Sequence, residues 1–206
     1  SILRTEKPDI LWFMTDPRFW GWLWEMENEI RPHVPMVYYH VWDNYPYPDF
    51  NKVFYDSKEF QKSLKTLSGL EFMSRIASGE LPQPPMGQTL GFRVAKVDSG
   101  RAVFEGIPRP EHYNPIGSVH GGFASTLLDS AMACAVHTRL DAGIFYTTLE
   151  IKVNLVRPVS ETTGLLRAVG TVLHCGKRTA TAEGRLLDES GKLHAHGTTT
   201  CLIFRE

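Results

Sequence analysis

The chain has 206 residues, a formal net charge of −1, 42% hydrophobic residues and 22% charged residues, which is typical of a globular protein with a core of ordinary size. A charge so close to zero argues against an electrostatic nucleic-acid binder. No apolar run reaches the ~18 residues that a membrane span needs. No basic stretch precedes the short N-terminal run ILWFM, so we expect neither a membrane protein nor a secretory signal peptide.

Three cysteines, Cys134, Cys175 and Cys201, are odd in number and follow no metal-binding spacing. All three lie in apolar or small-residue segments. This placement favours buried, reduced thiols and a cytoplasmic protein.

The first 57 residues differ in character from the rest. All five tryptophans lie there, acids outnumber bases, and the balance reverses after residue 57. The run DPRFWGWLWEMENEIRP predicts a helix that Asp16 caps and Pro32 ends, and MVYYHVW predicts a strand. One helix and one strand cannot bury a core alone. We therefore expect this aromatic-rich segment to dock on the rest of the chain or on another subunit.

The run MVYYHVWDNYPYPDFNKVFYDS resembles the N-terminal portion of certain glycosyltransferases. The half of such an enzyme that binds a sugar nucleotide has no counterpart in this sequence, so glycosyl transfer is not expected. We interpret residues 1–57 as a fused or recruited segment, followed by a second domain over residues 58–206.

The second part predicts an α+β fold. It begins with one or two helices in SKEFQKSLKTLSGLEFMSRIASGEL and a proline-rich connector, PQPPMG. Six strand-like runs follow, several joined by short glycine-containing turns: TLGFRVAKVD, RAVFEGIP, YTTLEIKVNLV, TGLLRAVGTVLHC, RTATAEGRLLD and KLHAHGTTTCLIF. Between the second and third runs, one apolar helix from Gly122 to about Arg139 must be buried against the sheet. An antiparallel sheet wrapped around one long helix is the hot-dog fold, and the small residues that would let the helix lie close are Ala180, Ala182, Gly184, Ala195 and Gly197.

Apolar and polar residues alternate in TLEIKVNLV, as in a strand with one buried face. The residues predicted to face the helix are Leu149, Ile151, Val153 and Leu155. The opposite, polar face would carry Thr148, Glu150, Lys152 and Asn154.

The run NPIGSVHGGFASTLLD contains groups suited to catalysis. Gly121 and Gly122 at a helix start would expose backbone N–H groups at the positive end of the helix dipole, where a carbonyl oxygen could bind as in an oxyanion hole. Alternatively, the two glycines serve only close packing of the helix. Asp129 has no Lys or Arg three or four positions away, so it is a catalytic acid, an interface residue or an ordinary polar edge.

This run also carries a family resemblance. It contains Asn-x-x-Gly-x-x-His-Gly-Gly followed by an aspartate, namely Asn114, Gly117, His120, Gly121, Gly122 and Asp129. With the later run TTLEIKVNLVRPV, it resembles the phenylacetate-degradation-type (PaaI-type) hot-dog acyl-CoA thioesterases, from about residue 68 to the C-terminus. The resemblance implies hydrolysis of acyl-CoA, with aryl-acyl-CoA as one candidate, to a free acid and coenzyme A. It implies no metal and no cofactor, and a homodimer or a homotetramer built as a dimer of dimers.

The resemblance assigns roles to individual residues. Asn114 and the N–H of Gly121 would polarise the thioester carbonyl, and Asp129 would act as nucleophile or as general base on a water. Thr148 stands where the family has a Ser or Thr that positions this water. The expected substrate contacts are His120, Gly122, Gly176, Lys177 and Arg178, of which the two cations either bind phosphates of coenzyme A or form a solvated turn.

Gly121 and Asp129 are eight residues apart, which is ~12 Å along a helix. A reacting carbonyl must lie within ~3 Å of its oxyanion donor and within reach of the base or nucleophile, so one straight helix cannot supply both groups. Two antiparallel helices related by a two-fold axis can, which predicts a dimer whose sites combine Gly121 of one subunit with Asp129 of the other.

Other functions remain open. A hot-dog hydratase would resemble D-x-N-P-[ILV]-H, but HYNPIG has His112 at the acid position and Gly117 at the histidine position. A metal site on His194 and His196 lacks an evident third ligand. A non-catalytic acyl-CoA-binding module is the alternative from another class, although pure binding gains nothing from the carboxylate of Asp129.

Overall fold

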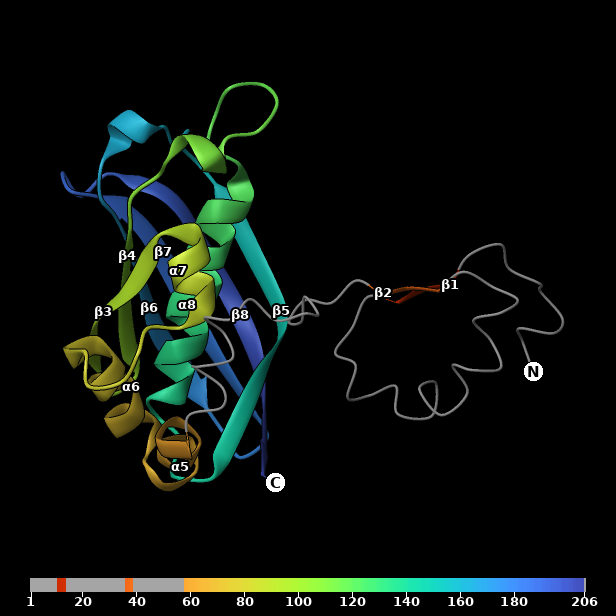
Figure 1. Ribbon diagram of the computed structural model, residues 1–206, viewed down its shortest axis with the longest axis vertical. Helices are drawn as coiled ribbons and strands as arrows, with labels where there is room; N and C mark the ends of the chain where they lie inside the picture. Colours follow the sequence, from red (N-terminus) through yellow and green to blue (C-terminus); the bar gives the residue numbers. More distant parts are fainter. Residues whose placement is uncertain (1–10, 14–35, 39–57, 206) are drawn as a thin grey trace, which may run out of the picture. The chain divides into compact units, whose positions relative to one another are not determined.

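The computed structural model describes residues 11–13, 36–38 and 58–205, and the chain divides into two units, residues 1–52 and 53–206. In the first unit, β1 (Leu11–Phe13) pairs in parallel with β2 (Met36–Tyr38) (Figure 1). The start of the predicted strand MVYYHVW is therefore extended. The predicted helix from Asp16 to Pro32 lies outside the described residues. The role of residues 1–57 and the domain boundary after residue 57 stay predictions.

The second unit is built on a six-stranded antiparallel sheet with the order β3-β4-β6-β7-β8-β5. Each of the six predicted runs forms one strand. The strands are β3 (Phe92–Asp98), β4 (Arg101–Gly106), β5 (Ile144–Leu155), β6 (Leu166–Cys175), β7 (Thr179–Asp188) and β8 (Leu193–Arg205). Because the order ends with β5, this strand pairs only with β8 within the described residues and forms an edge of the sheet.

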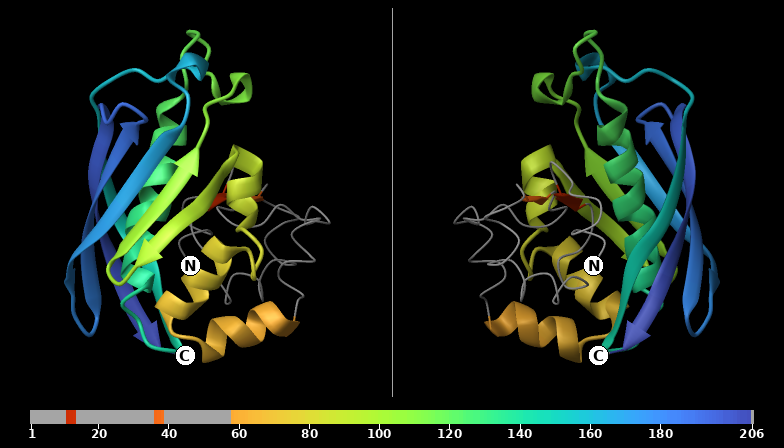
Figure 2. Two further views of the ribbon diagram at one scale, coloured as in Figure 1. Left: turned by 90° about the vertical axis from the view of Figure 1, so that its left-hand side faces the viewer. Right: turned by 90° about the vertical axis from the view of Figure 1, so that its right-hand side faces the viewer.

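Helix α8 (Gly121–His137) lies along the concave face of the sheet, as Figure 2 shows. Among its fully buried side chains are Leu127, Leu128 and Met132. This arrangement confirms the predicted hot-dog fold, with the helix beginning one residue earlier than predicted.

Small residues of the sheet make room for α8. Ala180, Ala182 and Ala195 are fully buried, and a β-carbon at Gly184 would lie 2.8 Å from Met132 Cγ of the helix. Gly197 does not serve this purpose, contrary to the prediction: a β-carbon there would meet the Lys152 carbonyl oxygen of β5 at 2.5 Å. A further close approach, which the sequence did not predict, occurs at Gly170, where a β-carbon would collide with the backbone of α8 at Ala131.

The segment before the sheet forms three helices, α5 (Lys58–Thr66), α6 (Gly69–Ser78) and α7 (Pro85–Leu90). The first two are separate because Ser68 starts α6 with a capping box: its Oγ accepts from Glu71 N–H, and its own N–H donates to the Glu71 carboxylate. The prediction of a proline-rich connector is partly wrong, since Pro85 occupies the first turn of α7. At this position a backbone N–H would have no partner within the helix, so the N–H that proline lacks is not missed. No helix in the described part of the chain is long and apolar enough to cross a membrane.

Strand β5 does not alternate regularly. Thr148 pairs with Cys201 and Glu150 pairs with Thr200, so Leu149 is an extra residue in a β-bulge. The side chains on the α8 side therefore change parity at this point. Leu149 is 59% exposed, although the alternation predicted that it would face the helix.

Candidate active site

The N-terminus of α8 is capped by His120. Its Nδ1 accepts a hydrogen bond from Gly122 N–H at 2.8 Å, and its carbonyl accepts from Phe123 N–H at 3.0 Å. In the described part of the chain, no acceptor takes the N–H of Gly121. The first turn of α8 thus keeps one amide available to a ligand, at the positive end of the helix dipole.

Both glycines of the HGG run also have packing roles. A β-carbon at Gly121 would lie 2.6 Å from Leu155 Cδ1, and one at Gly122 would lie 2.8 Å from His120 Nδ1. Close packing and an available N–H therefore coexist at this turn, so the two interpretations from the sequence do not exclude each other.

Asn114 organises the loop that leads into α8. Its Oδ1 accepts hydrogen bonds from the N–H groups of Ile116 and Ser118, both at 3.1 Å, and its Nδ2 donates to Ser118 Oγ at 2.9 Å. Gly117 completes the turn with a φ of 81°, which favours glycine. The side-chain amide nitrogen carries two hydrogens, so it can still donate one hydrogen bond to a ligand.

Asp129 lies half-buried in the middle of α8. Within the described residues it forms no ion pair, and its Oδ1 accepts a hydrogen bond from Thr148 Oγ1 at 3.1 Å. Burial raises the pKa of this carboxyl, and the hydrogen bond from Thr148 lowers it by a smaller amount. A carboxyl with a raised pKa can exchange a proton nearer to neutral pH than an ordinary one can.

Thr148 faces α8, which contradicts the orientation predicted from strand parity. The prediction assumed strict alternation through Glu150 and Lys152, but the bulge at Leu149 changes the parity. Before the bulge, the side chain of Thr148 points toward α8, as its contact with Asp129 shows. After the bulge, the side chain of Leu155 points toward α8, since Leu155 lies against Gly121. The prediction that Thr148 belongs to a site with Asp129 does not depend on this error.

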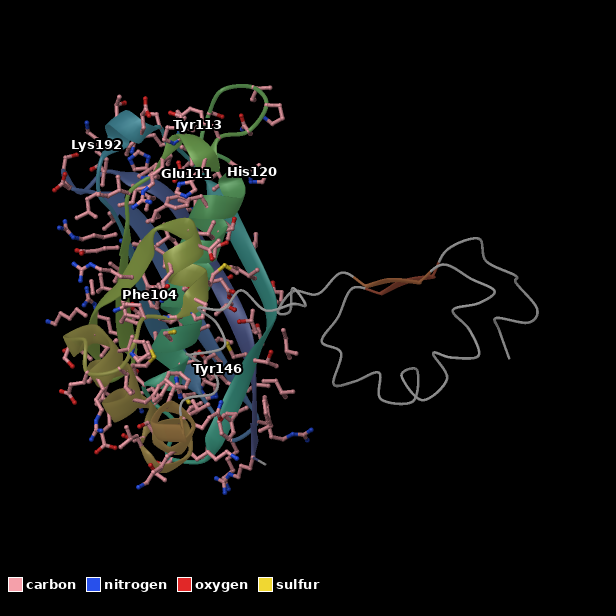
Figure 3. The ribbon with its side chains drawn as sticks, viewed as in Figure 1. Phe104, Glu111, Tyr113, His120, Tyr146 and Lys192 are labelled. Carbon is pink, nitrogen blue, oxygen red and sulfur yellow. The ribbon has the colours of Figure 1, made fainter. Side chains whose placement is uncertain are left out.

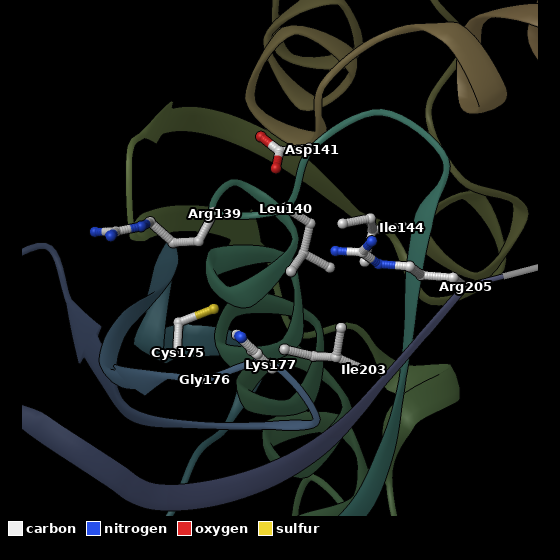
Figure 4. A pocket seen from close by; sticks show the side chains of 9 residues that line it. All are labelled: Arg139, Leu140, Asp141, Ile144, Cys175, Gly176, Lys177, Ile203 and Arg205. Atoms are coloured by element: carbon white, nitrogen blue, oxygen red, sulfur yellow. The ribbon is translucent and has the colours of Figure 1, made fainter.

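The hairpin residues predicted to bind substrate lie at the other end of α8. Gly176 and Lys177 line a pocket of about 210 Å³ together with residues that follow α8 (Figure 4). Arg178 does not line this pocket, and its carbonyl accepts a hydrogen bond from Ile203 N–H at 2.8 Å. In Figure 3, His120 lies near one end of the unit and Tyr146 toward the other.

In a single chain, the predicted site residues therefore form three groups along α8. Asn114 and residues 120–122 lie at its start, Asp129 and Thr148 at its middle, and residues 176–178 beyond its end. With 17 residues and ~1.5 Å per residue, α8 is about 25 Å long.

Histidines 194 and 196 do not form a metal site. His194 is buried and contacts Asp188 Oδ2 at 3.1 Å and the Pro158 carbonyl at 3.2 Å, whereas His196 is exposed. Among the described residues, no group of three His, Cys, Asp or Glu side chains could hold a metal ion.

Several residues near these groups were not predicted from the sequence. Tyr146 of β5 contacts the thiol of Cys134 at 3.9 Å, next to Asp129 and Thr148, and the bulge concealed that the face shared by Tyr146 and Thr148 points to α8. Arg139 and Arg205 line the pocket beside Lys177. They come from the ends of elements far apart in sequence, so no local pattern could have indicated them.

Comparison with known proteins identifies the family. The Thioesterase superfamily model matches residues 116–195. The chain is 28% identical over 106 residues, 52% of its own length and 85% of the relative, to a 1,4-dihydroxy-2-naphthoyl-CoA hydrolase of Listeria monocytogenes. Among solved structures, a phenylacetic acid degradation-related protein of Ralstonia eutropha is 32% identical with a TM-score of 0.57, and the match covers 63% of this chain and 98% of that one.

A second solved structure, a variant of the phenylacetic acid degradation protein PaaI of Thermus thermophilus, is 33% identical with a TM-score of 0.52. This match covers 58% of this chain and 98% of that one. The fold, the helix that begins with His-Gly-Gly and these similarities agree with one another. The chain belongs to the thioesterase superfamily and is a thioester hydrolase of the hot-dog, PaaI-like kind.

Proposed function

We propose that the protein hydrolyses acyl-CoA thioesters to a free acid and coenzyme A at sites shared between two subunits. The observation that carries the proposal is the pairing of Asp129 with Thr148 on the half-buried side of α8, in a helix whose first N–H has no acceptor among the described residues. Thioester hydrolysis needs an oxyanion donor and a carboxylate, and these are the two groups that α8 provides.

The carbonyl oxygen of the thioester would bind to Gly121 N–H and to the Asn114 amide of one subunit. Gly121 N–H lies at the start of α8, where the helix dipole favours the negative charge that develops on this oxygen, and Asn114 lies in the loop that leads into the helix. His120 and Gly122 would line the same position.

Asp129 of the other subunit would act on the carbonyl carbon. As a general base, it would take a proton from a water held by Thr148; the new C–O bond then displaces the thiolate, which takes up that proton. As a nucleophile, it would form a mixed anhydride and release the thiolate, and water would hydrolyse the anhydride. Both routes remain open, and both require the ionised carboxylate.

A shared site follows from the length of α8. Gly121 and Asp129 lie ~12 Å apart along the helix, which exceeds the ~3 Å over which a bound carbonyl contacts its donors. A two-fold axis that sets two α8 helices antiparallel would bring Gly121 of one copy opposite Asp129 of the other.

The surface around Asp129 supports such a dimer. Strand β5 is an unpaired edge in the described sheet, and its Leu149 and Leu155 are 59% and 57% exposed. Next to it, α8 presents a half-buried stripe that includes Ser125, Asp129 and Ser130. Apolar side chains on a long sheet edge are normally covered, and a second copy of this surface would cover them. A dimer of dimers and a cytoplasmic location stay predictions.

The acyl group is best sought among aryl-acyl-CoAs. The Listeria relative is named for hydrolysis of a naphthoyl-CoA, and two structural relatives are named for phenylacetic acid degradation. A panel of aryl-, short-chain and long-chain acyl-CoAs, followed by a free-thiol assay, tests the proposal. Folded protein that releases no coenzyme A above background from any member would refute it.

Two alternatives are less well supported. A hydratase would need an acid and a histidine where this chain has His112 and Gly117, and His112 is buried against Phe123 with a ring separation of 4.4 Å. A non-catalytic binding module would retain acyl-CoA intact, which the same assay combined with a binding measurement detects.

A further inference from the structure

The two proposed oxyanion donors lie in one stretch of chain, residues 113–121, and this stretch is held by the segment between β5 and β6. Val119 N–H donates a hydrogen bond to the Val159 carbonyl at 3.3 Å, and Glu161 N–H donates to the Tyr113 hydroxyl at 3.1 Å. One contact lies next to the donor amide of the loop, and the other lies two residues before the first N–H of α8. A shift of the segment between β5 and β6 would therefore also shift the donors.

His194, the second residue of β8, holds this segment in turn. Its carbonyl accepts hydrogen bonds from the N–H groups of Val156 and Arg157, at 2.9 and 3.0 Å. Its ring contacts the Pro158 carbonyl through Nδ1 at 3.2 Å. His194 is only 4% exposed. One buried residue thus holds three successive residues of the segment, two through its backbone and the third through its ring.

The turn between β7 and β8 fixes the other edge of the His194 ring. Nε2 of His194 lies 3.1 Å from Asp188 Oδ2, and Asp188 Oδ1 accepts hydrogen bonds from the Ser190 hydroxyl and from the N–H groups of Ser190 and Lys192. Hydrogen bonds from Ser190, His194 and Lys192 hold the pKa of Asp188 well below its ordinary value, so this side chain is an ionised acceptor. The ring cannot turn away from Pro158 without losing its contact with Asp188.

Both nitrogens of the ring therefore face acceptors, because neither the Pro158 carbonyl nor the Asp188 carboxylate can donate. A ring that carries hydrogen on both nitrogens makes both contacts. A buried polar group is costly to leave unpaired, so these two partners define one orientation of the ring. In Figure 3, Tyr113, His120 and Lys192 lie at the same end of the unit, which is the end where α8 begins.

We propose that His194 is a positioning residue for the oxyanion donors of its own chain. Its ring holds Pro158, and the segment that Pro158 opens holds residues 113–121 through Val159 and Glu161. This inference rests on the proposed function, and it adds a residue that acts on the reaction from outside the site. A misplacement of about 1 Å in a reacting geometry can cost ~10² in rate, so a bond that fixes the supporting segment affects kcat.

Two amide variants separate the two contacts of the ring. The amide nitrogen of asparagine is attached to Cγ, as Nδ1 of histidine is, so His194→Asn can still donate to the Pro158 carbonyl. The amide nitrogen of glutamine takes the place of Nε2, so His194→Gln can still donate to Asp188 but leaves the Pro158 carbonyl without its donor. We expect His194→Gln to lower kcat for an acyl-CoA by roughly 10–10² with KM nearly unchanged, and His194→Asn to retain most of kcat. The matched control is His196→Gln, because His196 is exposed on the same strand.

A second variant replaces His194→Gln should that protein not fold. Asp188→Ala leaves the ring with its contact to Pro158 but removes the partner that fixes its orientation. It should lower kcat in the same direction by a smaller factor, again with KM nearly unchanged.

A double-mutant cycle tests whether His194 acts through the oxyanion donors. Gly121→Pro already removes one donor, so adding His194→Gln to it should lower kcat by a much smaller factor than His194→Gln does in the wild type. Independent effects would instead multiply to within about twofold. A general loss of stability would give independent effects.

Hydrogen–deuterium exchange followed by mass spectrometry tests the support without turnover. In His194→Gln, peptides that cover residues 113–121 and 156–161 should exchange faster than in the wild type. The same peptides of His194→Asn and His196→Gln should exchange as in the wild type. Peptides from β3 serve as the internal reference, and a rise there as well would indicate global destabilisation.

Heterodimers assign the effect to one subunit. In a heterodimer of an Asp129→Asn chain and a Gly121→Pro chain, the single native site takes its oxyanion donors from the Asp129→Asn chain. Adding His194→Gln to that chain should lower kcat, and adding it to the Gly121→Pro chain should not.

The outcomes separate this inference from the proposed function. If the wild-type protein hydrolyses acyl-CoA, then unchanged kcat in His194→Gln, equal losses in His194→Gln and His194→Asn, or independent effects in the cycle would each overturn the inference and leave the proposed function standing. An effect confined to the Gly121→Pro chain would overturn it too. Absence of all acyl-CoA hydrolysis refutes the proposed function itself. Faster exchange confined to His194→Gln would then still support the hold of His194 on residues 113–121, and unchanged exchange would overturn it.

Discussion

Thr148 Oγ1 donates a hydrogen bond to Asp129 Oδ1 across 3.1 Å and so ties the edge strand β5 to the middle of α8. Two effects on the Asp129 carboxyl oppose each other: burial raises its pKa, and this hydrogen bond lowers it. A general base or a nucleophile must be ionised. The balance between burial and this hydrogen bond therefore determines the lowest pH at which the proposed reaction proceeds.

Removing this hydrogen bond should move the acid limb of the pH–rate profile. In Thr148→Val, burial still raises the pKa of Asp129 and no hydrogen bond from residue 148 lowers it, so this pKa is higher than in the wild type. As the pH is lowered, kcat/KM should therefore begin to fall at a higher pH than in the wild type. Thr148→Ser keeps the hydroxyl and should keep the acid limb. The measurement is kcat/KM against pH for the three proteins; coincident acid limbs for Val and wild type would show that Thr148 does not act on the carboxyl.

Asp129→Asn should abolish turnover without destabilising the fold. Because the folded-state pKa of Asp129 is raised, the folded protein binds the proton more tightly than the unfolded chain does. The free energy of unfolding therefore falls as pH rises from the unfolded pKa of about 3.9 through the folded pKa. At neutral pH, the Asn variant should have the same Tm as the wild type or a higher one, measured at one protein concentration. Near wild-type kcat, or a marked loss of Tm, would identify the carboxylate as structural.

The N–H of Gly121 can be removed with little change to the helix. Gly121 is the first residue of α8 and follows His120, whose backbone is extended, so proline fits this position. Gly121→Pro should lower kcat by ~10²–10³, the effect of losing one oxyanion donor. Gly121→Ala places a β-carbon against Leu155 as well but keeps the N–H, and it should retain most of the activity. Equal losses in both variants would attribute the effect to packing against Leu155.

Two inactive chains should complement each other if the site is shared. A heterodimer of Asp129→Asn and Gly121→Pro chains contains one site with both native groups and one with neither. After verified subunit exchange, activity should return to up to half of the wild-type value per dimer. An active monomer, or no recovery in purified heterodimers, would contradict the shared site.

Residues 58–206 should fold and hydrolyse acyl-CoA without the N-terminal segment. The six-stranded sheet, α8 and all the proposed site residues lie within this range, which is the basis for the prediction. We expect solubility to decrease more than kcat/KM, because the aromatic residues of segment 1–57 suggest docking and not catalysis. A soluble, folded 58–206 protein without activity would place that segment in the working enzyme.

The sequence predicted those features that repeat along the chain or begin at a strong local signal. Alternating apolar residues and glycine-containing turns identified all six strands, and the apolar run after His120 identified α8. The resemblance of the HGG run to one family gave the fold and the reaction class that the comparisons support.

Features that depend on contacts between distant residues were not predictable. The bulge at Leu149 has no sequence signal, because Thr148 and Glu150 fit a regular strand equally well. The packing of Gly170 against α8 and the convergence of Arg139, Lys177 and Arg205 exist only once the sheet has closed around the helix. The prolines of PQPPMG predict a connector, although proline is also a good first residue of a helix, which is the position of Pro85 in α7.

The extra residue at Leu149 limits how the edge strand can diverge. Residues before it face α8 with one parity and residues after it with the other, so Thr148 meets Asp129 while Leu155 meets Gly121. Substitution changes one side chain at a time and leaves both halves in phase. Deleting a residue within 150–155, or inserting one there, would instead rotate one half and present its polar side chains to the helix, whereas deleting Leu149 would only replace the bulge by a regular strand. In related sequences with the same bulge, length variation should therefore be confined to the loops on either side of this strand.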